Sequence, residues 1–500
     1  MRAIILALVL LLGNLSAPDL AQARPGGGHS SSGHSSSSSH SSSHSSSSHS
    51  SSFSRGYSSG VPVNSSPVAT MFFLILFVIV IIVILKNQNN PQSFSSAPTL
   101  INRANRQNKI RDALALLKQS DPNFSGILFL DFVHSLYSKF YSYSTHPEFS
   151  YLSPFLSTEL QKHFEEATPW TVNEVVINGI QWEDIVTVDT TESICLGIDA
   201  NYTLHLQNKR TRYAVTERWL LSRQKGLQSP EPDKMQTLCC PYCGAPAHFT
   251  DAGVCEHCGS VVHKGEMQWH LAKRVVLRTT ALAAGDLVSY AEEQGTQLAT
   301  IKQADLTEQL TSFQQRHSLA DWNVFWQPFV DDIVKAFFLT IYAHWSKRDW
   351  QAVRHLLSDR LYEANLFWQN LYVENNWFNR LDNIKIEQVE LVKIEQDKFY
   401  EAITVRIFAS CNDYTEDADG KIIGGSKRAL RRYSEYWTFV RRTGTEKHSA
   451  PYSLNQCPQC GAPADKMGQT AECGYCGSKI STGEFSWVLF LIMQDDVYEG

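Results

Sequence analysis

Cys240-Pro-Tyr-Cys243-Gly-Ala-Pro and Cys255-Glu-His-Cys258-Gly-Ser recur later in the chain as Cys457-Pro-Gln-Cys460-Gly-Ala-Pro and Cys473-Gly-Tyr-Cys476-Gly-Ser. Each copy holds two Cys-x-x-Cys pairs, and each pair is followed by glycine. These two segments have nearly identical sequences, which shows that the chain contains an internal repeat. Each segment marks the end of one copy.

The spacing of these cysteines predicts two structural zinc ions. Two Cys-x-x-Cys pairs supply the four thiolates of a tetrahedral site, and the glycines allow the tight turn that points both sulfurs inward. Four thiolates leave no open position for catalysis. The predicted ligands are Cys240, Cys243, Cys255 and Cys258 in the first copy, and Cys457, Cys460, Cys473 and Cys476 in the second. Cys239 is an alternative ligand because it adjoins Cys240.

The first 85 residues predict a membrane-anchored protein. Arg2, an apolar stretch and Ala21-Gln-Ala23 predict a signal peptide over residues 1–23. Residues 24–67 are rich in serine and histidine, which predicts a disordered tail with weak transition-metal binding as an alternative. The continuous apolar run 68–85 is about as long as a bilayer is thick, and it predicts a transmembrane helix.

The distribution of charge around this run predicts its orientation. Lysine and arginine are more frequent after residue 85 than before the run, which puts the tail outside and the rest of the chain in the cytoplasm. That reducing compartment suits zinc-binding thiols. Residues 86–108 are polar and are expected to form a flexible linker. The net charge of −6 argues against a nucleic-acid partner.

Beyond residue 108 the two copies can be followed residue by residue. Apolar residues at every fourth position predict a helix with one apolar face over 124–140, and the same pattern returns 201 positions later over 325–341. Ser157 and Leu160 pair with Ser358 and Leu361 at a second helix. The run 194–200, which alternates like a half-buried strand, pairs with 403–409. Each copy therefore predicts helices and then an antiparallel sheet, with the zinc ribbon inserted before the last strand, an α+β architecture.

The predicted boundaries follow from these patterns. They are a first unit at 109–235 with its zinc ribbon and closing strand at 236–275, a helical connector at 276–320, a second unit at 321–450, and a second ribbon and closing strand at 451–500.

The opening of each unit resembles the Tim44-like domain. The resemblance rests on Asp121-Pro-Asn-Phe124, the helix that follows and Ser157-Thr-Glu-Leu160, and on Phe325 to Ile341 with Leu357-Ser-Asp-Arg-Leu361 in the second unit. It implies two tandem cone-like units, related to nuclear-transport-factor-two-like folds, in a bacterial inner-membrane protein with a scaffolding or protein-transport role. The chain differs from the mitochondrial members of the family in its two units, its zinc ribbons and its own membrane span.

Two further features bear on partners and activity. The basic stretch 427–442 favours a solvated strand edge, with contact with anionic lipid or a partner, or with a nucleic-acid phosphate, as the alternatives. His134, His163, Glu217 and Glu435 are the candidates for polar groups in a cone cavity, but no nucleophile–base spacing or phosphate loop accompanies them. We therefore expect a non-enzymatic, membrane-tethered scaffold or transport accessory that binds a protein or lipid. The alternatives are a small-ligand or enzymatic pocket and an envelope metal sensor.

Overall fold

The computed structural model describes residues 96–500, apart from 144–150, 163–169, 207–208, 231–237, 239, 241, 244, 246–247, 251, 263–268, 283–294, 446–455, 464–470, 496–497 and 499. Within them, residues 105–500 form one compact unit. We call residues 109–275 the first repeat and 321–500 the second repeat. The expected signal peptide, histidine-rich tail and membrane span lie outside the described residues. No described helix is both long and apolar enough to cross a bilayer.

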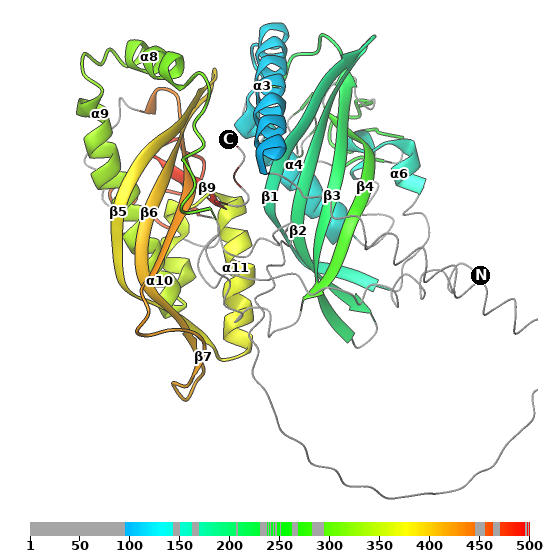
Figure 1. Cartoon of the computed structure of the whole chain (residues 1–500). Helices are drawn as coiled ribbons and strands as arrows, with labels where there is room; N and C mark the ends of the chain where they lie inside the picture. Colours follow the sequence, from blue (N-terminus) through cyan, green and yellow to red (C-terminus); the bar gives the residue numbers. More distant parts are fainter. Residues whose placement is uncertain are drawn as a thin grey trace, which may run out of the picture. The chain divides into compact units, whose positions relative to one another are not determined.

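The first repeat begins with helices and continues into a four-stranded antiparallel sheet (Figure 1). Its helices are α3 (Ser96–Ser120), α4 (Gly126–Ser142), the 3₁₀ turn η1 (Ser153–Phe155) and α6 (Thr158–Lys162). The strands are β1 (Trp170–Val188), β2 (Thr191–Leu206), β3 (Lys209–Gln224) and β4 (His270–Leu282), hydrogen-bonded in that order. The stretch that holds the first four cysteines lies between β3 and β4, as expected.

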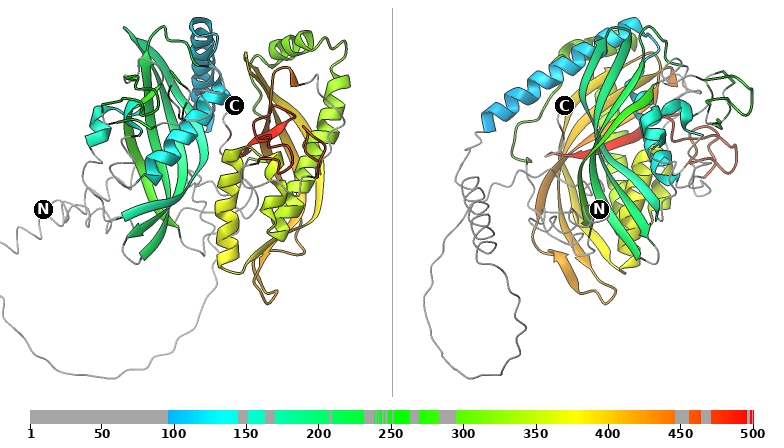
Figure 2. Two further views of the ribbon diagram at one scale, coloured as in Figure 1. Left: turned by 180° about the vertical axis from the view of Figure 1, so that it is seen from behind. Right: turned by 90° about the vertical axis from the view of Figure 1, so that its right-hand side faces the viewer.

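The second repeat follows the same plan. Its helical part contains α9 (Asn323–Pro328), the π-helical segment η3 (Phe329–Lys335), α10 (Ala336–Lys347), the 3₁₀ helix η4 (Trp350–Leu356) and α11 (Asp359–Glu374). Its sheet has the order β5 (Phe378–Gln396), β6 (Tyr400–Glu416), β8 (Arg431–Arg442) and β9 (Val488–Gln494), while β7 (Ile422–Gly425) pairs with β6. The strands of both sheets are long and twisted (Figure 2).

The strand registers show that the repeat found in the sequence is also present in the structure. The pairing of β1 with β2 shifts after Asn173, Ile177 and Trp182, and that of β5 with β6 shifts after Asp382, Ile386 and Leu391. Each position in the second group lies 209 residues after its counterpart in the first. Because a β-bulge bends a strand and increases its twist, equal bulges give the two sheets equal bends.

The cores form as the apolar spacing predicts. Phe124, Leu128, Phe132, Leu136 and Phe140 are all buried in the first repeat, where α4 packs against β1. Phe329, Ile333, Phe337 and Ile341 are buried in the second, while Phe325 is partly buried. Ser157 and Ser358 cap the helices α6 and α11. The side-chain oxygen of each serine accepts a hydrogen bond from a backbone N–H group, that of Leu160 in α6 and that of Leu361 in α11.

Three expectations need correction. Residues 96–108, expected to form part of a flexible linker, belong to α3, whose later residue Leu117 packs into the core of the first repeat. Strand β4 extends to Leu282, past the expected boundary at 275, and the helix of the connector is α8 (Leu306–Arg316). The first helix of the second repeat is interrupted by η3, directly after Pro328, because proline cannot donate the helical hydrogen bond.

One polar contact is common to both cores. Glu217 of β3 is fully buried and accepts hydrogen bonds from Trp219 at 2.8 Å and from Tyr141. Glu435 of β8 is likewise buried and accepts from Trp437 at 2.9 Å and Tyr342 at 2.7 Å. In the first repeat these two bonds use different oxygens of the carboxylate, whereas in the second repeat both use Oε2. The third donor to the carboxylate also differs between the repeats.

The difference lies in the closing strand. In the first repeat Arg274 of β4 donates to Glu217 at 2.6 and 3.0 Å. In the second repeat Gln494 of β9 donates to Glu435 at 3.1 Å. The first carboxylate therefore depends on a cation, and the second is bonded here to a neutral amide.

This arrangement predicts the effect of removing the cation. Arg274→Met should lower the free energy of unfolding by about 3 kcal/mol, because it leaves the buried Glu217 carboxylate without a counter-charge. Glu217→Gln removes that charge, so the double variant should cost less than the sum of the two single changes. Chemical denaturation followed by tryptophan fluorescence measures all three. Additive losses would show that Arg274 and Glu217 do not interact.

Candidate metal centres

The structure brings each predicted cysteine quartet together. Within each quartet all four Sγ atoms lie within 4.8 Å of one another. Cys240 and Cys258 are 3.8 Å apart and Cys243 and Cys255 3.9 Å apart. In the second quartet Cys457 and Cys476 are 3.8 Å apart, as are Cys460 and Cys473.

These separations fit a tetrahedral metal site. Four sulfurs at about 2.3 Å from a central zinc ion lie about 3.8 Å from each other. The quartets can therefore each hold a metal ion with little movement of the sulfurs. We call them the first centre and the second centre. Cys239 lies outside the described residues.

Local backbone turns place the sulfurs. In the first centre the N–H of Cys255 donates to the carbonyl of Ser260, and the N–H of Gly259 donates to the carbonyl of Cys255. The corresponding bonds in the second centre join Cys473 to Ser478 and Gly477 to Cys473. Gly259 and Gly477 have φ values of +73° and +72°, a conformation that glycine adopts without steric cost. The Cys-x-x-Cys-Gly pattern thus encodes the turn itself.

Hydrogen bonds favour the thiolate form of one ligand in each centre. The hydroxyl and the backbone N–H of Ser260 lower the pKa of the Cys258 thiol to about 6. Ser478 lowers the pKa of Cys476 to about 6 in the same way. Burial raises the pKa of Cys240 and of Cys457 to about 12. Each centre therefore has one cysteine that is readily deprotonated, and a cation would stabilise the thiolates of the others.

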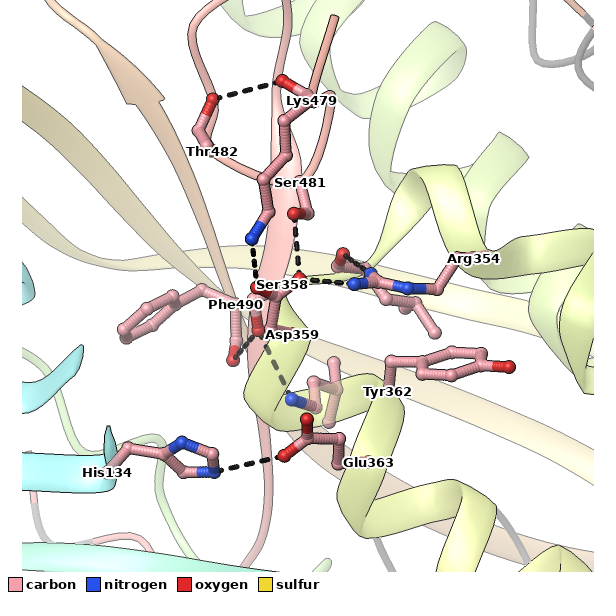
Figure 3. A network of polar contacts seen from close by, with 12 residues as sticks. His134, Arg354, Ser358, Asp359, Tyr362, Glu363, Lys479, Ser481, Thr482 and Phe490 are labelled. Atoms are coloured by element: carbon pink, nitrogen blue, oxygen red, sulfur yellow. Dashed lines mark hydrogen bonds and ion pairs between the residues drawn. The ribbon is translucent and has the colours of Figure 1, made fainter. Parts of the chain in front are cut away.

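The residues considered for a cone cavity have other surroundings. Glu217 and Glu435 are held in the cores described above. His134 of α4 is buried, and its Nε2 lies 3.8 Å from Oε2 of Glu363 on α11 (Figure 3). Burial lowers the pKa of His134 to about 3, so its ring is neutral at physiological pH. His163 lies outside the described residues. The proximity of His134 to Glu363 depends on how the repeats pack, which no local motif indicates.

The basic stretch 427–442 exposes less charge than the sequence suggested, although Lys427, Arg428 and Arg432 are exposed. Arg431 is buried and pairs with Asp413 at 2.9 Å, and Arg441 is buried and pairs with Glu401 at 3.0 Å. Both lie on β8, where alternate side chains point inward. Lys427 and Arg442 pair with Glu416 and Glu484 at 3.2 and 3.6 Å. The acidic partners come from distant segments, so the sequence alone suggested more free charge than the fold leaves.

Comparison with known families bears on the second repeat. Residues 321–456 match the model of the Tim44-like domain. The second repeat contains a Tim44-like domain. The matched range extends from the residues before α9 to the position preceding Cys457, so it excludes the second centre. No curated protein matches the chain. A Tim44-like domain suggests a scaffold or transport-associated role, and the two cysteine quartets fit zinc ribbons.

Metal content provides the first test of the centres. The purified full-length protein should contain two metal ions per chain, measured by elemental analysis. Cys243→Ser and Cys460→Ser should each remove one ion, because three sulfurs leave the tetrahedral site incomplete. A wild-type content near zero would contradict metal binding, and an unchanged content in either variant would exclude that cysteine as a ligand.

Acid should release the metal. Protons compete with the ion for thiolates, so affinity should fall as the pH is lowered, and more steeply below about 6, where Cys258 and Cys476 also bind protons. A chromogenic chelator can follow release in a pH titration. Equal retention from pH 7 to pH 4 would contradict thiolate ligation.

Proposed function

We propose that the protein is a non-enzymatic, membrane-tethered scaffold or transport accessory that binds a protein partner through its two repeats. A structural zinc ion in each centre completes the fold. The observation that carries this proposal is the Tim44-like domain at residues 321–456. The same plan of helices, sheet and cysteine quartet in the first repeat suggests a second surface of the same kind.

The interior of the repeats supports a scaffold over a pocket protein. Aromatic rings occupy the space between helices and sheet. The ring centroids of Tyr137 and Trp219 are 4.9 Å apart in the first repeat, and those of Phe338 and Trp437 are 5.2 Å apart in the second. One cavity beside α11, lined by residues that include Asn178, Arg360 and Phe490, has a volume of about 20 Å³. That volume suits a water molecule, whereas small-molecule pockets measure about 300–1,000 Å³.

The alternative of a ligand-binding or enzymatic cavity has less support. Its best candidates are the buried carboxylates Glu217 and Glu435, and both already accept hydrogen bonds from tyrosine and tryptophan side chains. A substrate would have to displace these bonds. Such carboxylates act as parts of the core.

Zinc is favoured over other metals by the donor set. Four thiolates in Cys-x-x-Cys pairs, with sulfur separations of 3.8–3.9 Å, suit tetrahedral zinc. The tether is proposed from the apolar run 68–85 and the orientation from the surrounding charges. Anionic lipid remains a secondary proposal, without the support of Arg431 and Arg441. The envelope metal-sensor alternative rests on the histidines of residues 24–67 alone.

Crosslinking in native membranes followed by affinity purification tests the proposal. The full-length protein should be recovered from the membrane fraction together with a defined protein partner. A control bait that ends at Ser95 keeps the apolar run but lacks both repeats, and it should lose that partner. Recovery of the same proteins with both baits, or of none with either, would refute the scaffold role. Recovery of the full-length protein from the soluble fraction would refute the tether.

A further inference from the structure

The two centres differ in what surrounds them, although their sulfurs are arranged alike. In the first repeat Cys240 and Cys255 are almost completely buried and belong to the main core. Phe249, which lies between the two cysteine pairs, is fully buried there, and its ring centroid is 6.1 Å from that of Phe155. Ser153 also donates a hydrogen bond to the carbonyl of Thr250 at 2.8 Å. The first centre is therefore part of the core that the helices and sheet share.

The second centre has a small core of its own. Among the described residues of the second ribbon, Cys457, Cys473 and Ile480 form a cluster separate from the main core of that repeat. Ile480 corresponds to Val262, which belongs to the main core in the first repeat. Equivalent apolar residues thus pack in the main core of the first repeat and in a small separate cluster in the second.

Polar contacts join the second ribbon to α11 (Figure 3). Nζ of Lys479 lies 2.7 Å from Oδ2 of Asp359, and the hydroxyl of Ser481 donates to Oδ1 of Asp359 at 2.8 Å. Arg354 is the third partner of this carboxylate. Asp359 and Lys479 are both more than 40% exposed, so the ion pair between them is worth little and can open and close.

Asp359 lies at a sensitive point of α11. It is the first residue of the helix, after the cap Ser358, and a carboxylate there interacts favourably with the helix N-terminus. Glu363, which faces His134 of α4, lies one turn farther along. Loss of the ribbon contacts to Asp359 would therefore loosen the first turn of a helix that contacts both β9 and β1.

The first repeat lacks this set of residues. Thr158 stands at the position that corresponds to Asp359, and Val261 at that of Lys479. A carboxylate–amine contact cannot form between a threonine and a valine. This carboxylate–amine contact is therefore particular to the second repeat.

We propose that the second centre is a metal-responsive latch on α11, whereas the first centre is a permanent part of its core. With metal bound, the turn Cys473–Ser478 and the bond from the N–H of Ile480 to the carbonyl of Ala471 at 2.9 Å hold Lys479 and Ser481 against Asp359. Loss of the ion frees that turn and leaves Asp359 with Arg354. The main core of the second repeat stays folded, because none of the described ribbon residues around the second centre belongs to it.

A pair of matched variants tests the latch in the full-length protein. Cys258→Ser and Cys476→Ser each remove an exposed ligand with the same hydrogen-bonding environment. Hydrogen exchange read by mass spectrometry follows each part of the chain, and elemental analysis follows the metal. Cys476→Ser should lose one ion and raise exchange over residues 359–366 about tenfold, with β5 and β6 unchanged. Cys258→Ser should lose one ion and raise exchange over β4 and α4.

Asp359→Asn separates the latch from the metal. It should reproduce the faster exchange over residues 359–366 while both ions stay bound, because it weakens the contact with Lys479 and leaves the cysteines intact. The latch is wrong if Cys476→Ser also exposes β5 and β6, if exchange at 359–366 does not change, or if Asp359→Asn has no effect. Equal consequences of the two cysteine changes would also refute it. No partner protein enters these measurements, so their outcome is independent of the scaffold role.

Discussion

Each sheet is completed by a strand that returns after a long insertion. β4 pairs with β3 only after residues 225–269, and β9 pairs with β8 only after residues 443–487, an insertion of equal length. Closing such a loop costs conformational entropy that grows with its length. A metal ion that binds both cysteine pairs restricts the unfolded insertion and lowers this cost. The burial of β9, and the contacts of Leu271 of β4 and Leu489 of β9 with the preceding helical turns, depend on that closure.

Much of this arrangement could be predicted from the sequence, because it depends on the spacing of residue types over short stretches of the chain. An apolar residue at every fourth position predicted α4, and alternating apolar residues predicted β2 and β6. The Cys-x-x-Cys-Gly motifs predicted which eight sulfurs come together. The repeat strengthened each of these interpretations, since the same residue types return at constant offsets. The register shifts of β1 and β5 likewise fall at equivalent positions.

What could not be predicted depends on contacts between distant segments. Arg431 and Arg441 looked like free charge because Asp413 and Glu401 lie on another strand. The polar residues before 109 looked like a linker because the helix α3 has only a sparse apolar face, and its packing on the first repeat decides its structure. The different surroundings of the two centres were hidden for the same reason. Their cysteine motifs are nearly identical, and residues outside the ligand set, such as Asp359 and Lys479, distinguish them.

The buried carboxylates show what the two repeats retained while their surroundings changed. Glu217 and Glu435 keep the same tyrosine and tryptophan donors, yet Arg274 serves one and Gln494 the other. An apolar residue would avoid the cost of burying a charge, so stability alone does not account for a glutamate at both positions. A fully bonded carboxylate does restrict the position of α4 and α10 against their sheets, because the tyrosine of each helix donates to it. Both repeats have this hydrogen bond between a helix and its sheet. They differ at the surface, where the ribbon of the second repeat contacts α11 through Asp359.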